Sequence, residues 1–462
     1  MKIGILFAAV CIATVLAPLP ARSQSPTDMA VLKGLAPVTT LAKPNNYAGQ
    51  AALGANFTVT GGIQTGDIRQ PTLLPFPEQQ QQALRDVYIT DDNLAQLADG
   101  LGTTLGSAYL ARAHYNDRQN FTTLSQAVTD LIAYANATTG FNSNAGKYFF
   151  ANVTKDGKTP VSEEAQDILK KNGGSPDIFG KAYGLPAGFP GADTYGNSRP
   201  FQTEPSLTRI FGRDYFGSPA DNIVYNRGPV MNLINSPSFP SGHTTYGYMG
   251  SVVLAVLVPE RYSEMMTRGA EYGNDRILIG AHYTMDVLGG RTLALYDLAH
   301  LLANDPAYVG QTFPGFPNIP KVADFREAVK KARADVVKAL EAACGNSIAV
   351  CAKQDTGRMS DAAINEAFYM CTLTYGLPVV YQNTANGLED VGKLAPEAGY
   401  LLTDAFPSLT LEEADRILTE TEGPGGGFLD DGSAFGVYSR LNLYAASRRA
   451  AQLAKTRAAT AH

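Results

Sequence analysis

The stretch Pro240-Ser241-Gly242-His243 stands directly before an apolar run, Thr244 to Val258, that has the composition of a buried helix. The first turn of a helix carries unpaired backbone N–H groups and a partial positive charge, and Gly242 lets that backbone approach an anion closely. The imidazole of His243 can give or take a proton near neutral pH. The stretch therefore predicts a phosphate-binding site at a helix start, with Ser241 hydrogen bonding to phosphate.

A second stretch reads Arg276-Ile-Leu-Ile-Gly-Ala-His282-Tyr-Thr-Met-Asp286. His282 and Asp286 are four residues apart, which predicts that they are neighbours on one helix face. A carboxylate there can hold one imidazole nitrogen as N–H and leave the other as a nucleophile. We expect Arg276 and Arg199 to supply two forks of N–H donors for phosphate oxygens.

Helical periodicity dominates the rest of the chain. Apolar residues recur at helical spacing from about Ile277 to Leu302, and again at Val322, Phe325, Val329, Val336 and Leu340. The pair Thr410 and Glu413 predicts a capping box at the start of a further helix that contains Ile417 and Leu418. No internal repeat and no alternating strand pattern of any length is found, so we predict an all-α fold.

At the two histidine stretches the sequence resembles the type 2 phosphatidic acid phosphatase superfamily. The family pattern is lysine, six residues, Arg-Pro; then Pro-Ser-Gly-His; then Ser-Arg, five residues, His, three residues, Asp. The second block is complete at residues 240–243, and the third is complete from Arg276 to Asp286. The residues around the two histidines look most like those of soluble bacterial class A nonspecific acid phosphatases, and residues 440–445 look like the tail of longer exported relatives.

This resemblance implies a helical bundle of the acid phosphatase/vanadium haloperoxidase type with a helical C-terminal extension. It implies an acid phosphatase that hydrolyses phosphomonoesters through a phosphohistidine on His282, with Asp286 orienting that imidazole and His243 serving the leaving group. No metal or cofactor is implied, and the partner is a small-molecule phosphomonoester. The expected phosphate-binding residues are Arg199, Ser241, Gly242 and Arg276.

The sequence departs from the family pattern at two positions. Asp275 stands where the pattern has serine, which predicts a negative charge beside the phosphate site. Ala192 stands where the family's phosphate-binding lysine belongs. Either Lys181 reaches the site, or Arg227 or another arginine substitutes, or the site works with less positive charge. Losing one charge-assisted contact could cost about 2–4 kcal/mol in the transition state.

The first 23 residues have the pattern of a cleaved secretory signal, with an apolar stretch from Ile3 to Leu16 and a small-x-small site at Ala21-Arg22-Ser23. Cleavage removes two basic residues and no acidic one, so the formal net charge moves from -6 to -8. Such an acidic chain is a poor candidate for nucleic-acid binding, and no later apolar run is long enough to cross a membrane. We predict a periplasmic or secreted protein with a catalytic domain at 24–320 and a helical extension at 321–462.

Three cysteines remain after cleavage, namely Cys344, Cys351 and Cys371. An oxidising compartment favours one disulfide and one free thiol. Cys344–Cys351 is the most local pairing, although the sequence leaves the pairing open. A zinc site is the weaker alternative, because no histidine lies nearby at finger-like spacing.

Other functions remain open beside the phosphatase. A vanadium-dependent haloperoxidase would use the same anion site, with His282 as a vanadium ligand, and a non-catalytic phosphate-binding protein would need only the cradle. A metal site built from His243, His282 and Asp286 is disfavoured, because the nearby arginines repel a cation. His114, His300 and His462 are expected to be structural. Substrate identity and oligomeric state are not determined by the sequence.

Overall fold

The structure is a computed structural model that describes residues 24–68, 70–89, 95–113, 124–173, 178–179, 193–204, 207–228 and 231–460. Several positions singled out in the sequence lie outside these residues: the predicted signal at 1–23, His114, Lys181, Ala192 and His462.

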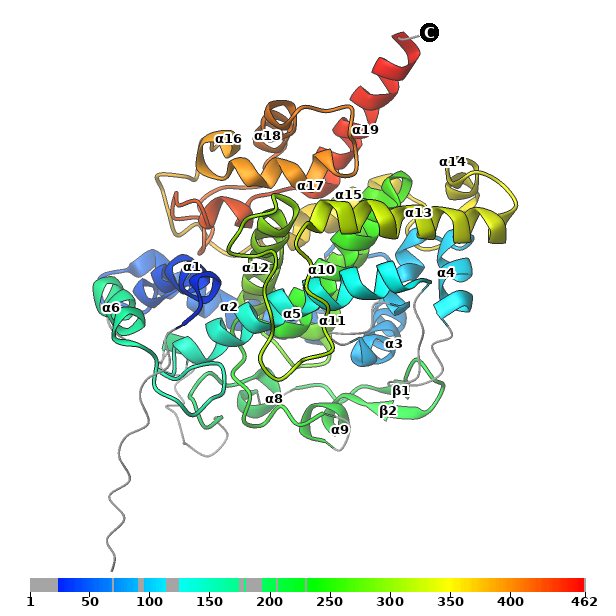
Figure 1. Cartoon of the computed structure of the whole chain (residues 1–462). Coiled ribbons are helices and arrows are strands. Elements are labelled where there is room, and N and C mark those ends of the chain that lie inside the picture. Colours follow the sequence, from blue (N-terminus) through cyan, green and yellow to red (C-terminus); the bar gives the residue numbers. More distant parts are fainter. Residues whose placement is uncertain are drawn as a thin grey trace, which may run out of the picture.

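The described part of the chain is almost entirely helical, and the predicted all-α fold is confirmed (Figure 1). Its only strands, β1 (Phe211–Arg213) and β2 (Pro219–Asp221), form one small antiparallel pair. None of the described helices is both long and apolar enough to cross a membrane. The α-helices are α1 (Pro26–Leu35), α2 (Tyr47–Thr65), α3 (Phe76–Arg85), α4 (Leu105–Ala113), α5 (Gln126–Phe149), α6 (Glu163–Asn172), α8 (Pro200–Thr203), α9 (Asn222–Arg227), α10 (Gly242–Leu257), α11 (Tyr262–Leu278), α12 (Thr284–Leu302), α13 (Phe325–Cys344), α14 (Ile348–Cys351), α15 (Ala362–Thr372), α16 (Val391–Leu394), α17 (Tyr400–Thr403), α18 (Leu411–Glu420) and α19 (Leu443–Thr460).

Helix α10 lies at the centre of the bundle, where it packs on α11, α12 and α5 (Figure 1). It begins at Gly242, two residues earlier than the apolar run indicated, because the Ser241 Oγ accepts the Thr244 N–H at 3.2 Å and caps the helix. A β-carbon at Gly290 of α12 would lie 2.5 Å from the Ser241 carbonyl oxygen. The missing side chain at Gly290 therefore lets α12 approach the start of α10 closely.

The predicted continuous helix from Ile277 to Leu302 is wrong. Helix α11 ends at Leu278 and α12 begins at Thr284. Between them Gly280 adopts the left-handed conformation, with a φ of 75°, and the N–H groups of Ala281 and His282 bond back to the Arg276 carbonyl. A left-handed glycine that ends a helix in this way is common, since glycine has no β-carbon to oppose that conformation.

The C-terminal helices share the core of the central bundle. One hydrophobic cluster continues from α10–α12 into α13–α19, and α13 buries Phe325, Val329 and Leu340 as its periodicity predicts. The capping box of Thr410 and Glu413 is confirmed at the start of α18. The division into domains at residue 320 stays a prediction.

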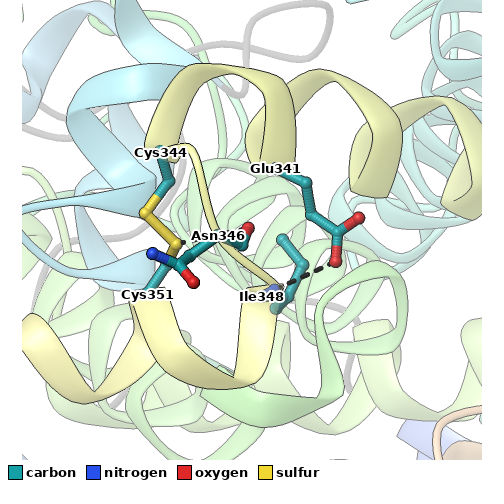
Figure 2. The surroundings of a disulfide bond; sticks show 5 residues. All are labelled: Glu341, Cys344, Asn346, Ile348 and Cys351. Carbon is teal, nitrogen blue, oxygen red and sulfur yellow. Dashed lines mark hydrogen bonds between the residues drawn. A yellow bond between two sulfur atoms is a disulfide. The ribbon is translucent and has the colours of Figure 1, made fainter.

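A disulfide joins Cys344, at the end of α13, to Cys351, at the end of α14 (Figure 2). Their Cα atoms are 6.4 Å apart. Within the loop they close, the Ile348 N–H donates to Glu341 Oε1 at 3.1 Å. The expected disulfide is present with the local pairing, and Cys371 is a free thiol.

Replacing Cys351 with serine is expected to lower the free energy of unfolding by about 2–3 kcal/mol, because the unfolded chain is no longer constrained by a closed loop. Urea unfolding followed by circular dichroism measures the change. Cys371→Ser is the matched control and should shift stability by less than about 1 kcal/mol, since it removes no cross-link. Equal effects of the two variants would contradict a stabilising disulfide.

Candidate active site

The residues singled out in the two sequence stretches meet at one end of the central helices. His243 lies in the first turn of α10, Arg276 in the last turn of α11 and Asp286 in the first turn of α12. Arg199 lies just before α8, which sits with α9 at the lower edge of the molecule in Figure 1. All four side chains are buried, and so is His282 between α11 and α12. The structure therefore places together residues from four separate segments.

His282 meets Asp286 in a different way from the predicted shared helix face. His282 lies before α12, and only Asp286 belongs to that helix. The carboxylate folds back over the helix start, where Asp286 Oδ2 accepts the Tyr283 N–H at 2.8 Å and lies 3.4 Å from His282 Nδ1. A helix cap thus brings the two side chains together.

Ser238 adds a contact to this pair that the sequence did not indicate. Its Oγ donates a short hydrogen bond to Asp286 Oδ2 and lies 3.2 Å from His282 Nδ1. Ser238 is fully buried two residues before Pro240, within the loop that leads into α10. The spacing of the motifs did not point to Ser238, so its contact with His282 and Asp286 is visible only in the folded chain.

Arg199 closes the other side of the imidazole. Its Nη1 lies 3.0 Å from His282 Nε2, while its remaining N–H groups donate to the carbonyls of Ser236, Pro237 and Ala281 and to the Ser236 hydroxyl. A guanidinium has no acceptor, so this hydrogen bond requires a lone pair on Nε2 and places the imidazole proton on Nδ1. That tautomer is the one in which Nε2 can act as a nucleophile.

Arg276 is held by Tyr225 of α9. No sequence pattern indicated Tyr225 as a residue of this site. The Arg276 Nη2 donates to the Tyr225 hydroxyl at 3.3 Å, and the guanidinium carbon lies 5.3 Å from the ring centroid. The same hydroxyl is 3.5 Å from His243 Nε2. The Nε and Nη1 of Arg276 are buried and have no hydrogen-bond partner among the described residues. Because such donors are costly when unpaired, they are suited to an anion.

Asp275 lies in a buried cluster around Arg268. Burial, the nearby carboxylates of Asp86 and Glu271, and a hydrogen bond with Asp86 raise the pKa of Asp275 well above its usual range. The raised pKa favours the neutral carboxyl group, which weakens the negative charge that the sequence predicts at this position. The Arg268 guanidinium contacts Asp86 at 2.6 and 2.8 Å.

Lys147 of α5 reaches the same site, although no spacing in the sequence pointed to it. The residue is 7% exposed, and its Nζ lies 3.5 Å from Ser236 Oγ. A β-carbon at Gly242 would stand 3.7 Å from that Nζ. Arg227, one of the substitutes considered for the missing lysine, donates instead to the Phe201 carbonyl at 3.1 Å.

The positive surroundings control the ionisation of the histidine pair. Burial lowers the pKa of His282 well below its ordinary value of 6.5, and the charges of Arg199, Lys147 and Arg276, with a further contribution from His243, lower it more. Burial raises the pKa of Asp286 to about 6, although hydrogen bonds from Ser238 and the Tyr283 N–H oppose that rise. The lowered pKa of His282 favours its neutral imidazole, and the raised pKa of Asp286 brings that carboxylate nearer to neutral pH.

Residues 183–304 match the family model described as PAP2 superfamily. Three proteins similar to this chain are bacterial acid phosphatases. The non-specific acid phosphatase of Salmonella typhimurium is 40% identical over 84 residues, which cover 18% of this chain and 30% of that protein. The acid phosphatase of Zymomonas mobilis is 33% identical over 102 residues, covering 22% of this chain and 32% of the relative. The non-specific acid phosphatase of Providencia stuartii is 36% identical over 72 residues, which cover 16% of this chain and 29% of that protein.

This chain thus spans about a third or less of the length of each of these relatives. The matched segment contains the histidine pair, Arg199, Arg276 and the start of α10, whereas α5 lies before it. The family resemblance drawn from the motifs is confirmed for this segment. Residues 183–304 thus match the PAP2 superfamily model, and the chain is similar over part of its length to bacterial non-specific acid phosphatases.

Proposed function

We propose that this protein is an acid phosphatase that hydrolyses phosphomonoesters through a phosphohistidine at His282. The observation that carries the proposal is the buried cationic cradle around a neutral imidazole. Arg276 keeps two buried N–H donors without partners, and Arg199 contacts the nucleophilic nitrogen itself. A phosphate group supplies the negative charge and the acceptors that this arrangement lacks.

In the first step the phosphate oxygens take up the N–H groups of Arg199 and Arg276 and of the α10 start at Gly242, while the Ser241 N–H stays on the Asp286 carbonyl at 3.0 Å. Arg199 releases the His282 Nε2 lone pair as it turns to the anion. That nitrogen attacks phosphorus in line, a P–N bond forms, and the bond from phosphorus to the ester oxygen breaks. His243 donates a proton to the leaving oxygen, so an alcohol departs.

In the second step water replaces the alcohol. His243, now neutral, removes a proton from the water as its oxygen attacks phosphorus. The P–N bond breaks, inorganic phosphate leaves, and His282 regains its lone pair. Asp286 holds the Nδ1 proton throughout and stabilises the positive charge that the phosphorylated imidazole carries. All of these steps use side chains of the chain itself.

We also propose that the protein is exported to the periplasm or the medium. The disulfide between Cys344 and Cys351 supports this location, because disulfides persist in oxidising compartments. The signal pattern at residues 1–23 is the second support.

A vanadium haloperoxidase would use the same anion site, and the names of the similar bacterial proteins favour the phosphatase. The two functions separate in one experiment. We expect the purified protein to release p-nitrophenol from p-nitrophenyl phosphate, to be inhibited by vanadate, and to show no peroxide-dependent bromination when vanadate is added. Bromination without phosphate ester hydrolysis would overturn the proposal in favour of the haloperoxidase, and vanadate binding without either reaction would favour a phosphate-binding protein.

The same assay run against pH tests the role of Asp286. The raised pKa of about 6 means that this carboxylate gains a proton as the pH falls through 6. We expect kcat/KM to fall on the acid side of about pH 6, because a protonated Asp286 no longer accepts the Nδ1 proton of His282. Asp286→Asn should lower the rate and remove this acid limb, while the titration of the substrate remains in both proteins as an internal control. An acid limb near the ordinary aspartate value of 3.8 would contradict the assignment.

A further inference from the structure

We propose that Lys147 of α5 binds the phosphoryl group directly and supplies the third cation of the anion cradle, from outside the segment that matches the family. The inference rests on the proposed function, since it assigns a further substrate-binding residue to the same site. It also answers the question raised by Ala192, which occupies the position of the family lysine.

The packing of α5 aims Lys147 at the start of α10. A β-carbon at Gly140 would lie 3.2 Å from the Tyr246 hydroxyl of α10, and Ser143 Oγ is 3.4 Å from the β-carbon position of Gly242. Lys147 follows at the next turn on this face, with its Cε 3.5 Å and its Nζ 3.7 Å from the same β-carbon position. The ammonium group therefore stands beside the backbone that is expected to bind phosphate.

No carboxylate forms an ion pair with Lys147 in the described part of the chain, and the side chain makes one hydrogen bond, to Ser236 Oγ at 3.5 Å. Burial and the charges of Arg199 and Arg276 lower the pKa of Lys147 well below 10.5, while Asp286 and Asp193 raise it. A buried ammonium group without a counter-ion is unfavourable. A phosphate group would provide that counter-ion.

Ser236 links Lys147 to the rest of the cradle. Its hydroxyl contacts both Lys147 Nζ and Arg199 Nη2, the latter at 3.1 Å, and Arg199 in turn contacts His282. Lys147 and Arg199 thus reach the Ser236 hydroxyl from two different elements, and Arg199 also contacts the imidazole. A purely structural lysine would support the loop through Ser236 but would leave anion affinity unchanged.

The test measures binding of inorganic vanadate to the full chain by isothermal titration calorimetry. Lys147→Met removes the charge and keeps the length, and Lys147→Gln is a second neutral variant in case the first does not fold. We expect each to weaken vanadate binding by roughly 10–100-fold, as for a lost charge-assisted contact. Lys147→Arg should recover most of the affinity. Lys170→Met is the matched control, because Lys170 lies on the surface of α6 with a side chain that is 67% exposed.

Circular dichroism melting establishes that each variant is folded. Vanadate affinity within about twofold of the wild-type value in a folded neutral variant would overturn the inference. So would equal losses in Lys147→Arg and Lys147→Met, because they would show that charge is not the property that matters. Wild-type protein that binds vanadate without hydrolysing phosphate esters would contradict the proposed function alone. The role of Lys147 would still be tested, because comparing the vanadate affinities of the variants requires no turnover. Hydrolysis with unchanged vanadate affinity in the neutral variants would instead overturn the role of Lys147 alone.

Discussion

Replacement of His282 by alanine is expected to lower kcat for p-nitrophenyl phosphate by a factor on the order of 10⁴ or more. The proposed P–N bond cannot form without Nε2, the nitrogen that Arg199 contacts at 3.0 Å. Steady-state kinetics on the folded variant measures the loss. Vanadate binding is expected to weaken less than turnover, because Arg199, Arg276 and the start of α10 remain.

His300, on the helix that follows His282, offers a matched control. It bonds through Nδ1 to Asp305 at 2.8 Å and stacks on Tyr308, so its expected role is structural. His300→Ala should change stability but leave kcat within about threefold of the wild-type value. A folded His282→Ala protein that kept more than about a tenth of the wild-type kcat would contradict the nucleophile assignment.

Replacement of His243 by alanine is expected to have an effect that depends on the leaving group. A general acid contributes about 10²–10⁴-fold when the departing oxygen must be protonated. We therefore expect a loss in that range for alkyl phosphates and a smaller loss for p-nitrophenyl phosphate, whose leaving group is a stable anion. Comparing kcat/KM over a series of aryl and alkyl phosphates measures this difference.

The same variant should accumulate the phosphoenzyme. Once an aryl phosphate has transferred its phosphoryl group, hydrolysis lacks the base that activates water. Rapid quenching with ³²P-labelled substrate should reveal label that is stable in alkali and labile in acid, as expected of a phosphorus–nitrogen bond. The double variant His243→Ala/His282→Ala should carry none. Equal losses for all leaving groups, without trapped label, would mean that His243 only positions the anion.

Local sequence signals were sufficient where one segment decides the outcome. The helix after Pro240 was predicted from the apolar run that begins at Thr244, which belongs to consecutive residues, and the structure adds Ser241 as its cap. The buried face of α13 follows from its periodicity alone. The Cys344–Cys351 pairing was the most local of the pairings that the sequence left open, and the structure contains it.

The break between α11 and α12 shows where local signals failed. The apolar pattern continues through residues 277–283, and it gives no reason to end a helix at Leu278. Gly280 could have been read as a stop, although glycines are also frequent inside the tightly packed helices of this core, as at Gly247 and Gly290. Only the packed structure distinguishes a glycine that ends a helix from one that lets two helices approach.

The sequence by itself predicted the two histidines, the aspartate and the two arginines as residues of one site, because each matches a position in a family motif. Tertiary structure decided the tautomer of His282, through Arg199, and the raised pKa of Asp275. It also decided that Lys147 lies beside Gly242. Each of these outcomes depends on burial and on charges from other segments, and electrostatic interactions act through space, so they leave no fixed spacing along the chain.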